Sequence, residues 1–520
     1  MKNKKIRLLF SLSFLIMVVT WWSFAAVGCQ SSYNETGITR EELETHLKFL
    51  AHDDRGGRFP GTPGYMAAAE YVRARLKESG LEAVCKDEKG KNSYFQSVPM
   101  RHFIYGKDNS IKVKSSKGEK VFTNLKDFYF ESPGEGGTRR ISGTPVYIGC
   151  GIHESGIWND FAGLDIKGKP VFLGQYFPAK RNGKHVLPKI LLQKYGFGFP
   201  SMQKYPAILE RGASCIIHVP RKGQAANWDF FSSQAHVSSL RPVHPYGAEW
   251  LFVHPVPVIV ASKAMIDYFF EDKPFDPVEW KTPYETFEFN GFEITIEIDV
   301  TEELIYSPNV VGLVRGTDPE LKNTYIAVGA HLDHLGIFEG QVFNGACDDA
   351  SGCAALMEAA RELVKNPTKR SVLFLFFTGE ESSLSGSRYF VEHCPVPLEQ
   401  IKTFINVDEV GGKKDNNKQM DINIASRSRG SHSFEKAMLA AGKILDKATL
   451  KIDKTEPKPY QVHWVDDYSF IKKGIPIIVI GAFPNYGDHT PGDDVEKINF
   501  EHLHEVTRFI HALVLELGNQ

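Results

Sequence analysis

Two short stretches of the sequence contain residues that can bind a divalent metal ion. The first, GAHLDHLG, contains His331, Asp333 and His334, and the second, GACDDASG (345–352), contains Asp348. Imidazole and carboxylate side chains are ligands that Zn²⁺ binds in proteins. A metal site here requires that other segments bring further side chains of these types to the same place.

Four apolar segments each lead into a histidine or an acid. TYIAVGA precedes His331, SVLFLFF is followed by Glu380 and Glu381, KTFINV by Asp408, and PIIVIGA by a loop that carries His489. Solid apolar runs of this length are typical of strands buried in a parallel sheet. Because ligands bind such sheets beyond the carboxyl ends of the strands, these side chains are expected to meet at one edge.

Each of these residues also has an ordinary structural explanation. An aspartate after a strand is commonly a helix N-cap or a turn residue, and Asp349, just before an expected helix, suits a cap. A single histidine is usually a surface group. Separate caps, however, need not gather two histidines and several acids at one edge of a sheet. The joint pattern therefore favours a metal site.

The number of available ligands predicts two zinc ions. A catalytic zinc takes three protein ligands and water, whereas this sequence offers five: His331, Asp348, Glu381, Asp408 and His489. Five ligands fit two ions about 3.5–4 Å apart with one shared carboxylate. Glu380, left uncoordinated, is expected to act as general base, and Asp333 to accept a hydrogen bond from the His331 ring. We interpret His334 as a neighbour of the site.

The elements that position these residues follow an α/β rhythm. Strands are expected at 324–330, 371–377, 402–408, 421–426 and 476–482, and helices at 349–365, 385–393, 431–447 and 500–517. Apolar strands alternating with amphipathic helices predict a mixed, largely parallel sheet with helices on both faces. Upstream, a capping box at Thr39 predicts a helix to about residue 51, and a second helix is expected at 67–80.

Length and composition narrow the class of protein. The 520 residues suggest two or three domains, and 42% hydrophobic and 24% charged residues are typical of a globular protein. The formal net charge is −2, and no run of basic residues could follow a phosphate backbone. Nucleic-acid binding is therefore not expected. Short β-like runs separated by Gly and Pro from about 108 to 300 predict a β-rich domain.

The N-terminus resembles a bacterial lipoprotein signal. A basic start is followed by an apolar stretch at 8–22, which is shorter than the roughly 20 residues of a spanning helix. Small residues then precede Cys29, the expected site of lipidation, and Gln30 is similar to the residue of lipoproteins sent to the outer membrane. The expected location is the cell envelope, anchored in the outer membrane and facing the periplasm. The alternative is a secretory signal cut near Ala25 and a secreted protein.

The motifs resemble a known family. GAHLDHLG, GACDDASG, TGEESSLSGS, NVDEVGG and DHTPGDD occur in the order and spacing of the aminopeptidase Y and glutamate carboxypeptidase II family of co-catalytic dizinc exopeptidases. The resemblance covers about 290–520, and RGGRFPGTPGYMAAAEYV at 55–72 is similar to the family's N-terminal segment. It implies a zinc-exopeptidase fold of the phosphorylase/hydrolase-like type and two zinc ions per chain.

The resemblance also implies individual roles. His331 and Asp408 would hold one zinc ion, Glu381 and His489 the other, and Asp348 would bridge them. By the same resemblance Glu380 is the base, Asp333 the orienting acid, and the peptide bond after Asp348 is cis.

The middle of the chain resembles the protease-associated domain inserted in many members of this family. The resulting division comprises a signal peptide at 1–28, a tether at 29–38, the first part of the catalytic domain at 39–125, a β-rich protease-associated insert at 126–275, and the rest of the catalytic domain at 276–520.

Two departures from the family pattern bear on the substrate. Asp488 stands where many members have Tyr before the last His, the nearest tyrosine being Tyr486, and Val465-Asp466-Asp467 replaces Ser-Asp-His. Added acid suits the free amine of a peptide substrate, so an aminopeptidase that cleaves the N-terminal peptide bond is expected.

Four alternatives remain open at this stage. A carboxypeptidase or dipeptidase would need a cation for the substrate carboxylate, for which Arg388 and Arg427 are candidates. A glutaminyl cyclase would use one zinc ion, and a non-catalytic receptor would be expected to have lost ligands. The complete set of five ligands favours a peptidase over these last two.

Overall fold

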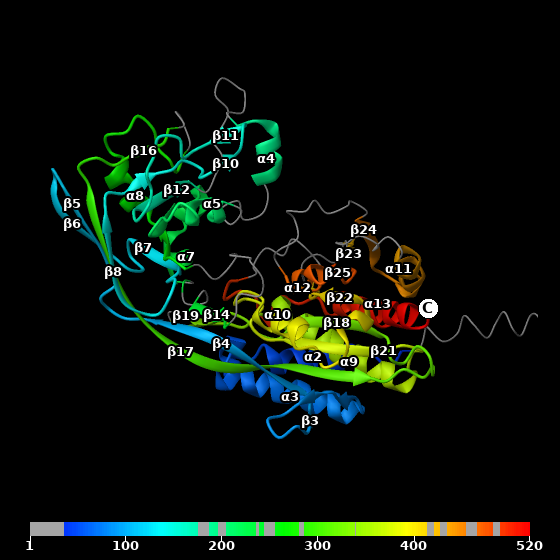
Figure 1. Cartoon of the computed structure of the whole chain (residues 1–520). Helices are drawn as coiled ribbons and strands as arrows, with labels where there is room; N and C mark the ends of the chain where they lie inside the picture. Colours follow the sequence, from blue (N-terminus) through cyan, green and yellow to red (C-terminus); the bar gives the residue numbers. More distant parts are fainter. Residues whose placement is uncertain are drawn as a thin grey trace, which may run out of the picture.

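The computed structural model places the chain in two lobes joined by one long strand (Figure 1). It describes residues 36–174, 187–195, 204–233, 235, 239–243, 255–279, 285–338, 340–412, 421–426, 434–453, 465–481 and 489–520. The expected signal peptide and most of the tether, including Cys29, lie outside the described residues. Within the described ranges, no helix combines the length and apolar character needed to cross a bilayer.

The larger lobe is built on a 13-stranded sheet with a parallel centre. Its main path runs β14-β4-β17-β21-β18-β22-β25-β23-β24. Four neighbours run parallel: β21 (Ser371–Phe377), β18 (Tyr325–His331), β22 (Ile401–Val407) and β25 (Ile477–Gly481). Next to them β23 (Asp421–Ser426) is antiparallel to β25 and parallel to β24 (Thr449–Asp453). The expected mixed sheet is confirmed for this lobe; its four central strands are parallel, and most of the outer pairs are antiparallel.

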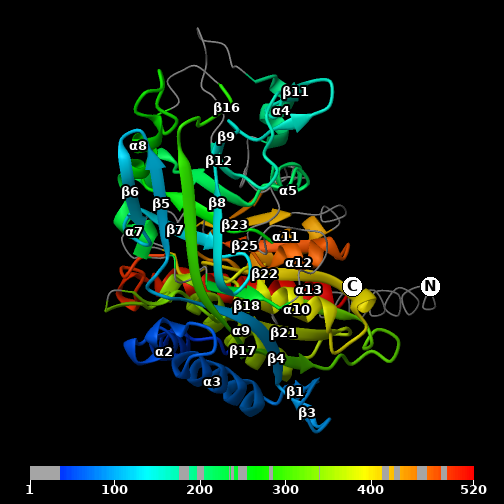
Figure 2. The same cartoon turned by 60° about the vertical axis from the view of Figure 1, so that its left-hand side comes forward.

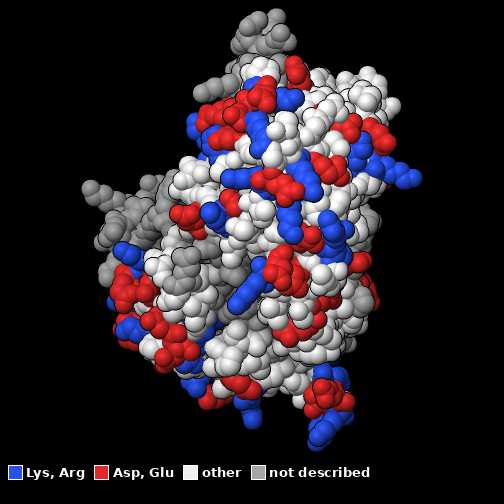
Figure 3. Space-filling model, turned by 90° about the vertical axis from the view of Figure 1, so that its left-hand side faces the viewer, with Lys and Arg blue, Asp and Glu red and all other residues white. Residues whose placement is uncertain are grey.

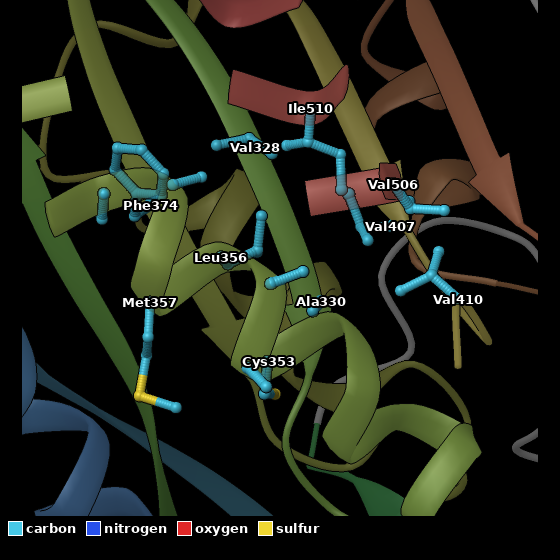
Figure 4. Packing of buried hydrophobic residues seen from close by; sticks show 14 of the residues in the cluster. Val328, Ala330, Cys353, Leu356, Met357, Phe374, Val407, Val410, Val506 and Ile510 are labelled. Atoms are coloured by element: carbon cyan, nitrogen blue, oxygen red, sulfur yellow. The ribbon is translucent and has the colours of Figure 1, made fainter. Parts of the chain in front are cut away.

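Helices cover both faces of the parallel strands. One face packs against α2 (Arg40–Leu50), α3 (Pro63–Ser79), α9 (Gly352–Lys365), α11 (Glu435–Ala441) and α13 (Phe500–Gly518). The other packs against α10 (Ser385–Glu392) and α12 (Asp467–Lys472). Figure 4 shows strand residues Val328 and Phe374 beside Leu356 of α9 and Ile510 of α13. Successive residues of a strand face opposite sides of the sheet. Because helices cover both sides, the residues facing either side are mostly apolar, which explains the solid apolar runs.

Some boundaries differ from those expected. The helix expected from residue 349 begins at Gly352, after an irregular turn η3 (Ala346–Ser351), and the helix expected at 431–447 is α11 followed by the 3-10 turn η6 (Gly442–Ile444). α3 begins at Pro63 because Thr62 caps it and proline at the first position loses no helical hydrogen bond.

One strand, β17 (Glu293–Val314), spans both lobes (Figures 1 and 2). Its last residues pair with β21, its middle with β4 (Phe95–Tyr105), and its first residues with β5 (Ser110–Ser115) and β8 (Gly137–Gly143). β6 (Gly118–Thr123) pairs with β5 at the edge. The alternating burial of its first eight residues matches the period of a strand with one exposed face.

The first part of β17 forms an arm between the lobes with β4, β5, β6 and β8. Ion pairs link strands on the exposed side of this arm. Arg101 lies 2.7 Å from Glu302, and Glu297 lies 3.7 Å from both Lys112 and Arg140. On the face drawn in Figure 3, acidic and basic side chains are interspersed over the arm and the second lobe. Opposite charges on neighbouring strands stabilise the pairing of those strands.

The smaller lobe contains a six-stranded sheet. Its order is β16 (Phe287–Glu288), β9 (Val146–Tyr147), β12 (Pro170–Gly174), β13 (Cys215–Val219), β15 (Val258–Ala261) and β7 (Phe128–Ser132). Its core, which α8 (Lys263–Phe270) helps to cover, also includes Phe103, Phe122, Phe289 and Val300. The packed lobe therefore takes in residues on both sides of the insert predicted at 126–275.

The remaining elements are short. The strands are β1 (Glu82–Ala83), β2 (Cys85–Lys86), β3 (Asn92–Ser93), β10 (His153–Glu154), β11 (Trp158–Asn159), β14 (Leu240–Pro242), β19 (Gly336–Phe338) and β20 (Gln341–Phe343). The helices and turns are η1 (Asp53–Arg58), α4 (Lys189–Tyr195), α5 (Tyr205–Leu209), α6 (Lys222–Ala226), α7 (Trp228–Ser233), η4 (Leu398–Gln400) and η7 (Val495–Lys497).

Candidate metal centre

The residues expected at the metal site come from the carboxyl ends of four neighbouring parallel strands. His331 is the last residue of β18, Asp408 follows β22, and Glu381 lies just beyond β21. His489 lies beyond β25, and Asp348 lies in the turn η3 before α9. Because β21, β18, β22 and β25 are direct neighbours in the sheet, side chains far apart in the sequence reach one edge of it.

The first group of donors consists of one imidazole and two carboxylates. His331 Nε2 lies 2.9 Å from Asp348 Oδ1 and 3.6 Å from Asp408 Oδ1. All three side chains are buried, and one ligand atom from each lies within 4.8 Å of the others. Three protein donors at one point leave room for a further ligand of a tetrahedral ion.

Asp348 presents its other oxygen to a second group. Asp348 Oδ2 lies 3.2 Å from His489 Nε2, and that nitrogen lies 3.1 Å from Glu381 Oε1. His334, interpreted from the sequence as a neighbour, belongs to this group by position, since its Nδ1 lies 3.1 Å from Glu381 Oε1. The carboxylate of Asp348 is thus shared by the two groups, one oxygen to each.

These separations fit sets of metal ligands. Two donors that each lie ~2.0–2.1 Å from a tetrahedral zinc ion are about 3.3 Å from one another. Neighbouring donor atoms in the two groups lie 2.9 to 3.7 Å apart. Glu381 Oε1 is buried, yet it forms no hydrogen bond with any described residue. Nitrogen and oxygen donors of this kind suit zinc, so the residues present fit a metal ion at each group.

The main chain around Asp348 is held by an acid that sequence reasoning did not single out. Asp493 accepts hydrogen bonds from the main-chain N–H groups of Cys347 (2.8 Å) and Asp348 (3.0 Å). The peptide bond between Asp348 and Asp349 is cis, as the family resemblance predicted. Asp493 lies within the quoted motif DHTPGDD, but only the fold shows that it fixes the turn carrying the shared carboxylate.

Asp349 ties three segments of the site together. It accepts a hydrogen bond from the N–H of Gly352 (3.0 Å) in the first turn of α9, which agrees with the expected cap. It also accepts from the N–H groups of His331 (3.3 Å) and Glu409 (3.2 Å). One buried carboxylate therefore links the end of β18, the end of β22 and the start of α9.

Arg58 is a second residue that sequence reasoning missed. Its side chain is fully buried, and its guanidinium donates to four main-chain carbonyls, those of Leu50, Leu332, Asn344 and Gly345. Three of these carbonyls belong to the two loops that carry His331 and Asp348. The quoted segment RGGRFPG contains Arg58, but its role depends on contacts that the sequence alone does not reveal.

Asp333 does not form the contact expected of it. Its carboxylate Oδ1 lies 3.9 Å from His331 Nδ1, and that nitrogen instead faces the main-chain oxygen of Asp333 at 3.1 Å. The carboxylate accepts a hydrogen bond from the N–H of Glu380 at 3.1 Å. Asp333 thus connects the loop after β18 with the loop after β21, and the imidazole is oriented by a main-chain oxygen.

The crowding of acids shapes the electrostatics of the site. Burial raises the pKa of the Glu380 carboxyl well above its usual range, and the nearby Glu381, Asp466 and Asp408 carboxylates raise it further against the effect of His331. Burial likewise raises the pKa of Asp466 to about 7. Burial would also raise the pKa of Asp348, but the neighbouring imidazoles of His331 and His489 hold it well below its usual range. A surplus of acid of this kind favours bound cations.

The residues weighed for substrate binding are only partly described. Asp466 is buried just before α12, next to Asp467 at its start. Arg388 of α10 is buried too, with its guanidinium 5.8 Å from the centre of the Tyr468 ring. Arg427, Tyr486 and Asp488 lie outside the described residues.

A parallel sheet covered on both faces, with imidazole and carboxylate donors in two groups at its carboxyl edge, defines an α/β protein with a candidate metal centre. Residues 309–514 match the model of Peptidase family M28. The matched range carries the motifs from which the resemblance to such a family was predicted.

Individual relatives agree with this assignment. An aminopeptidase of Pseudomonas aeruginosa (strain UCBPP-PA14) is 33% identical over 378 residues, which make up 70% of this chain and 56% of that protein. The matches to the curated relatives span between 23% and 56% of those proteins' lengths.

Solved structures share the fold. The aminopeptidase from Aneurinibacillus sp. strain AM-1 aligns with a TM-score of 0.59 at 18% identity, covering 92% of this chain and 94% of its own. A zinc aminopeptidase from Bacillus subtilis aligns with a TM-score of 0.52 at 18% identity, covering 94% and 97%. At these identities the likeness establishes the fold.

Proposed function

We propose that the chain is a zinc-dependent aminopeptidase that binds two Zn²⁺ ions and hydrolyses the N-terminal peptide bond of peptides. The observation that carries this proposal is Asp348, which offers one carboxylate oxygen to each of two donor groups. Peptidase family M28 and relatives named aminopeptidases support it. In this proposal His331 and Asp408 hold one ion, and Glu381 and His489 hold the other.

Zinc, when bound, supplies a Lewis acid that polarises the scissile carbonyl and lowers the pKa of water toward about 7. The residues of the chain supply positioning and proton transfer. Glu380 lies close enough to His331 and Glu381 for their charges to act on its carboxyl. It takes the proton of the attacking water and passes it to the leaving amine. Asp333 holds the main chain of Glu380 in place through the hydrogen bond to its N–H.

A free substrate amine agrees with the charge of the site. Asp466, Asp408 and Glu380 lie close enough for their charges to act on one another. An ammonium group would offset this repulsion, whereas a second carboxylate from a substrate C-terminus would add to it. The acidity that the sequence suggested therefore supports an aminopeptidase over a carboxypeptidase.

Three substrates separate these activities: an aminoacyl anilide with a free amine, its N-acetylated form, and an N-blocked peptide with a free carboxylate. We expect cleavage of the first only, with loss of cleavage after a chelator and recovery on adding Zn²⁺. Release of the chromophore and of amino acids measures it. Cleavage of the N-blocked peptide would favour the carboxypeptidase instead, and full activity after complete removal of metal would exclude the zinc mechanism.

We further propose the domain plan and anchoring expected from the sequence. Residues 1–28 serve as signal peptide and 29–38 as tether, Cys29 carries lipid in the outer membrane facing the periplasm, and residues 126–275 are a protease-associated domain between the catalytic segments 39–125 and 276–520. The basic and apolar character of the first residues and the Cys that follows support the anchor.

Replacing Cys29 tests this anchor. Expressed in a bacterium, the wild-type chain is expected to partition with membranes and into detergent, and Cys29→Ser is expected in the soluble fraction. Cys85→Ser is a matched control because Cys85 is buried in β2. A soluble wild-type chain, or a Cys29→Ser variant that still partitions into detergent, would contradict lipidation at this residue.

A further inference from the structure

His334 is the histidine of the site to which neither the sequence nor the family resemblance gave a role. Its side chain is fully buried, and within the described residues neither ring nitrogen forms a hydrogen bond. Its Nδ1 nevertheless lies 3.1 Å from Glu381 Oε1 and 3.7 Å from Asp348 Oδ2. Donor atoms that lie this close without the geometry of a hydrogen bond have the arrangement of ligands around a shared metal ion.

The position of the His334 ring is built into the fold. Gly345, at φ +56°, lies against the ring so closely that a Cβ there would be 2.4 Å from Cγ and 2.6 Å from Cδ2 of His334. The N–H of His334 donates to the main-chain oxygen of Arg58 (3.3 Å), and the Arg58 side chain donates to the oxygen of Gly345 (2.9 Å). The imidazole is therefore held from two sides, with its Nδ1 directed to the second donor group.

We propose that His334 Nδ1 is a fourth protein ligand of the second zinc ion, beside Asp348, Glu381 and His489. This inference rests on the function proposed above. The distances from Asp348 and Glu381 to the two imidazoles are 3.1 to 3.7 Å, close to the roughly 3.3 Å between ligand atoms of tetrahedral zinc. A ring that only packed here would leave Nδ1 buried beside two carboxylates without a partner, which is rare in folded proteins.

The proposal makes the two metal positions unequal. Four protein donors close a tetrahedral zinc site, as in sites with a structural role, whereas three leave a position for water or substrate. The second ion, held by Glu381, His489, His334 and Asp348, would be retained more tightly. The open position would belong to the first ion, at His331 and Asp408.

Two variants of the full-length chain test the ligand directly. His334→Ala removes the donor, while His334→Cys replaces it with a thiolate. The shorter reach of a cysteine is offset by the longer metal–sulfur bond, ~2.3 Å against ~2.0–2.1 Å for metal–nitrogen. His511→Ala in α13 is the matched control, because His511 is also a buried histidine whose ring nitrogens form no hydrogen bond with described residues.

The readouts are bound metal and its spectrum. Over a series of chelator concentrations, wild type and His511→Ala are expected to keep the second zinc ion at concentrations where His334→Ala has lost both ions. In the Co²⁺-loaded protein, His334→Cys is expected to gain a thiolate-to-cobalt charge-transfer band that wild type lacks. Retention of both ions by His334→Ala with wild-type affinity, or a folded His334→Cys variant without the band, overturns the inference. A wild-type chain that binds no zinc overturns the proposed function instead.

Discussion

Glu380→Gln is expected to keep two zinc ions per chain while its rate falls by about 10²–10⁴-fold, the usual contribution of a general base. The amide keeps the shape of the side chain and can still donate and accept hydrogen bonds, but it cannot accept a proton at neutral pH. The position of Glu380 supports this role, because it directly precedes the donor Glu381 and its N–H donates to the Asp333 carboxylate at 3.1 Å.

Glu381→Gln is the matched comparison, since the two residues are adjacent and the substitution is the same. Glu381 lies 3.1 Å from both His489 Nε2 and His334 Nδ1. A neutral amide is a poor ligand in a group of imidazoles and carboxylates, so this variant is expected to lose zinc as well as activity. Metal analysis of both purified variants beside a rate assay separates the two roles.

Two outcomes would change the assignment. Full activity in Glu380→Gln would remove the proposed proton transfer. Loss of zinc from Glu380→Gln, with zinc retained in Glu381→Gln, would exchange the roles of the two glutamates. Neither substitution removes the Glu380 N–H that donates to the Asp333 carboxylate, so a difference between the variants is expected to arise from the side chains.

The sequence predicted the centre of the sheet well because both faces are buried. Strands such as β21 must then be apolar at every position, and the first polar residue beyond the strand becomes conspicuous. Glu380 and Asp408 stand out for this reason, directly after SVLFLFF and KTFINV. The parallel order of β21, β18, β22 and β25 then brings those residues to one edge.

The supporting contacts could not be predicted because they involve main-chain atoms. Asp493 and Asp349 each accept hydrogen bonds from N–H groups of residues that the topology brings near them. A main-chain N–H is the same chemical group in every residue except proline, so the sequence carries no signal for such pairs. Gly345 is a related case, since its need for a small residue arises from the approach of the His334 ring.

The sequence did not predict the arm around β17, because its strands pair over long distances in the chain. Alternating residues in β17 predict a strand, but its 22 residues exceed the usual length of about 3–10. The strand continues because it has different partners along its length, β5 and β8 at its start, β4 in the middle and β21 at its end. The pairing of segments roughly 200 residues apart, such as Arg101 with Leu304, is not visible in local patterns.

Arg58→Leu is expected to lower the free energy of unfolding by about 3 kcal/mol or more, since hydrogen bonds to a charged group contribute ~1.5–3 kcal/mol each and do not add fully. Leucine fills much of the same space but leaves the carbonyls of Leu50, Leu332 and Asn344 without the guanidinium donor. Arg58→Lys keeps the charge but has no planar fork to reach several carbonyls at once, so an intermediate loss is expected.

Arg58→Leu is also expected to weaken zinc binding, an effect that a loss of stability alone would not produce. Because the loops that Arg58 joins carry His331 and Asp348, zinc affinity in Arg58→Leu is expected to fall by about 10–100-fold, the range for residues that support metal ligands. Chelator competition well below the melting temperature measures this effect, and denaturant unfolding measures stability. Arg55→Leu in the same turn η1 is the control, because Arg55 stacks its guanidinium on Phe49 at 4.7 Å. Equal losses of zinc affinity in Arg55→Leu and Arg58→Leu, or wild-type affinity in Arg58→Leu, would show that Arg58 does not position the metal-binding loops.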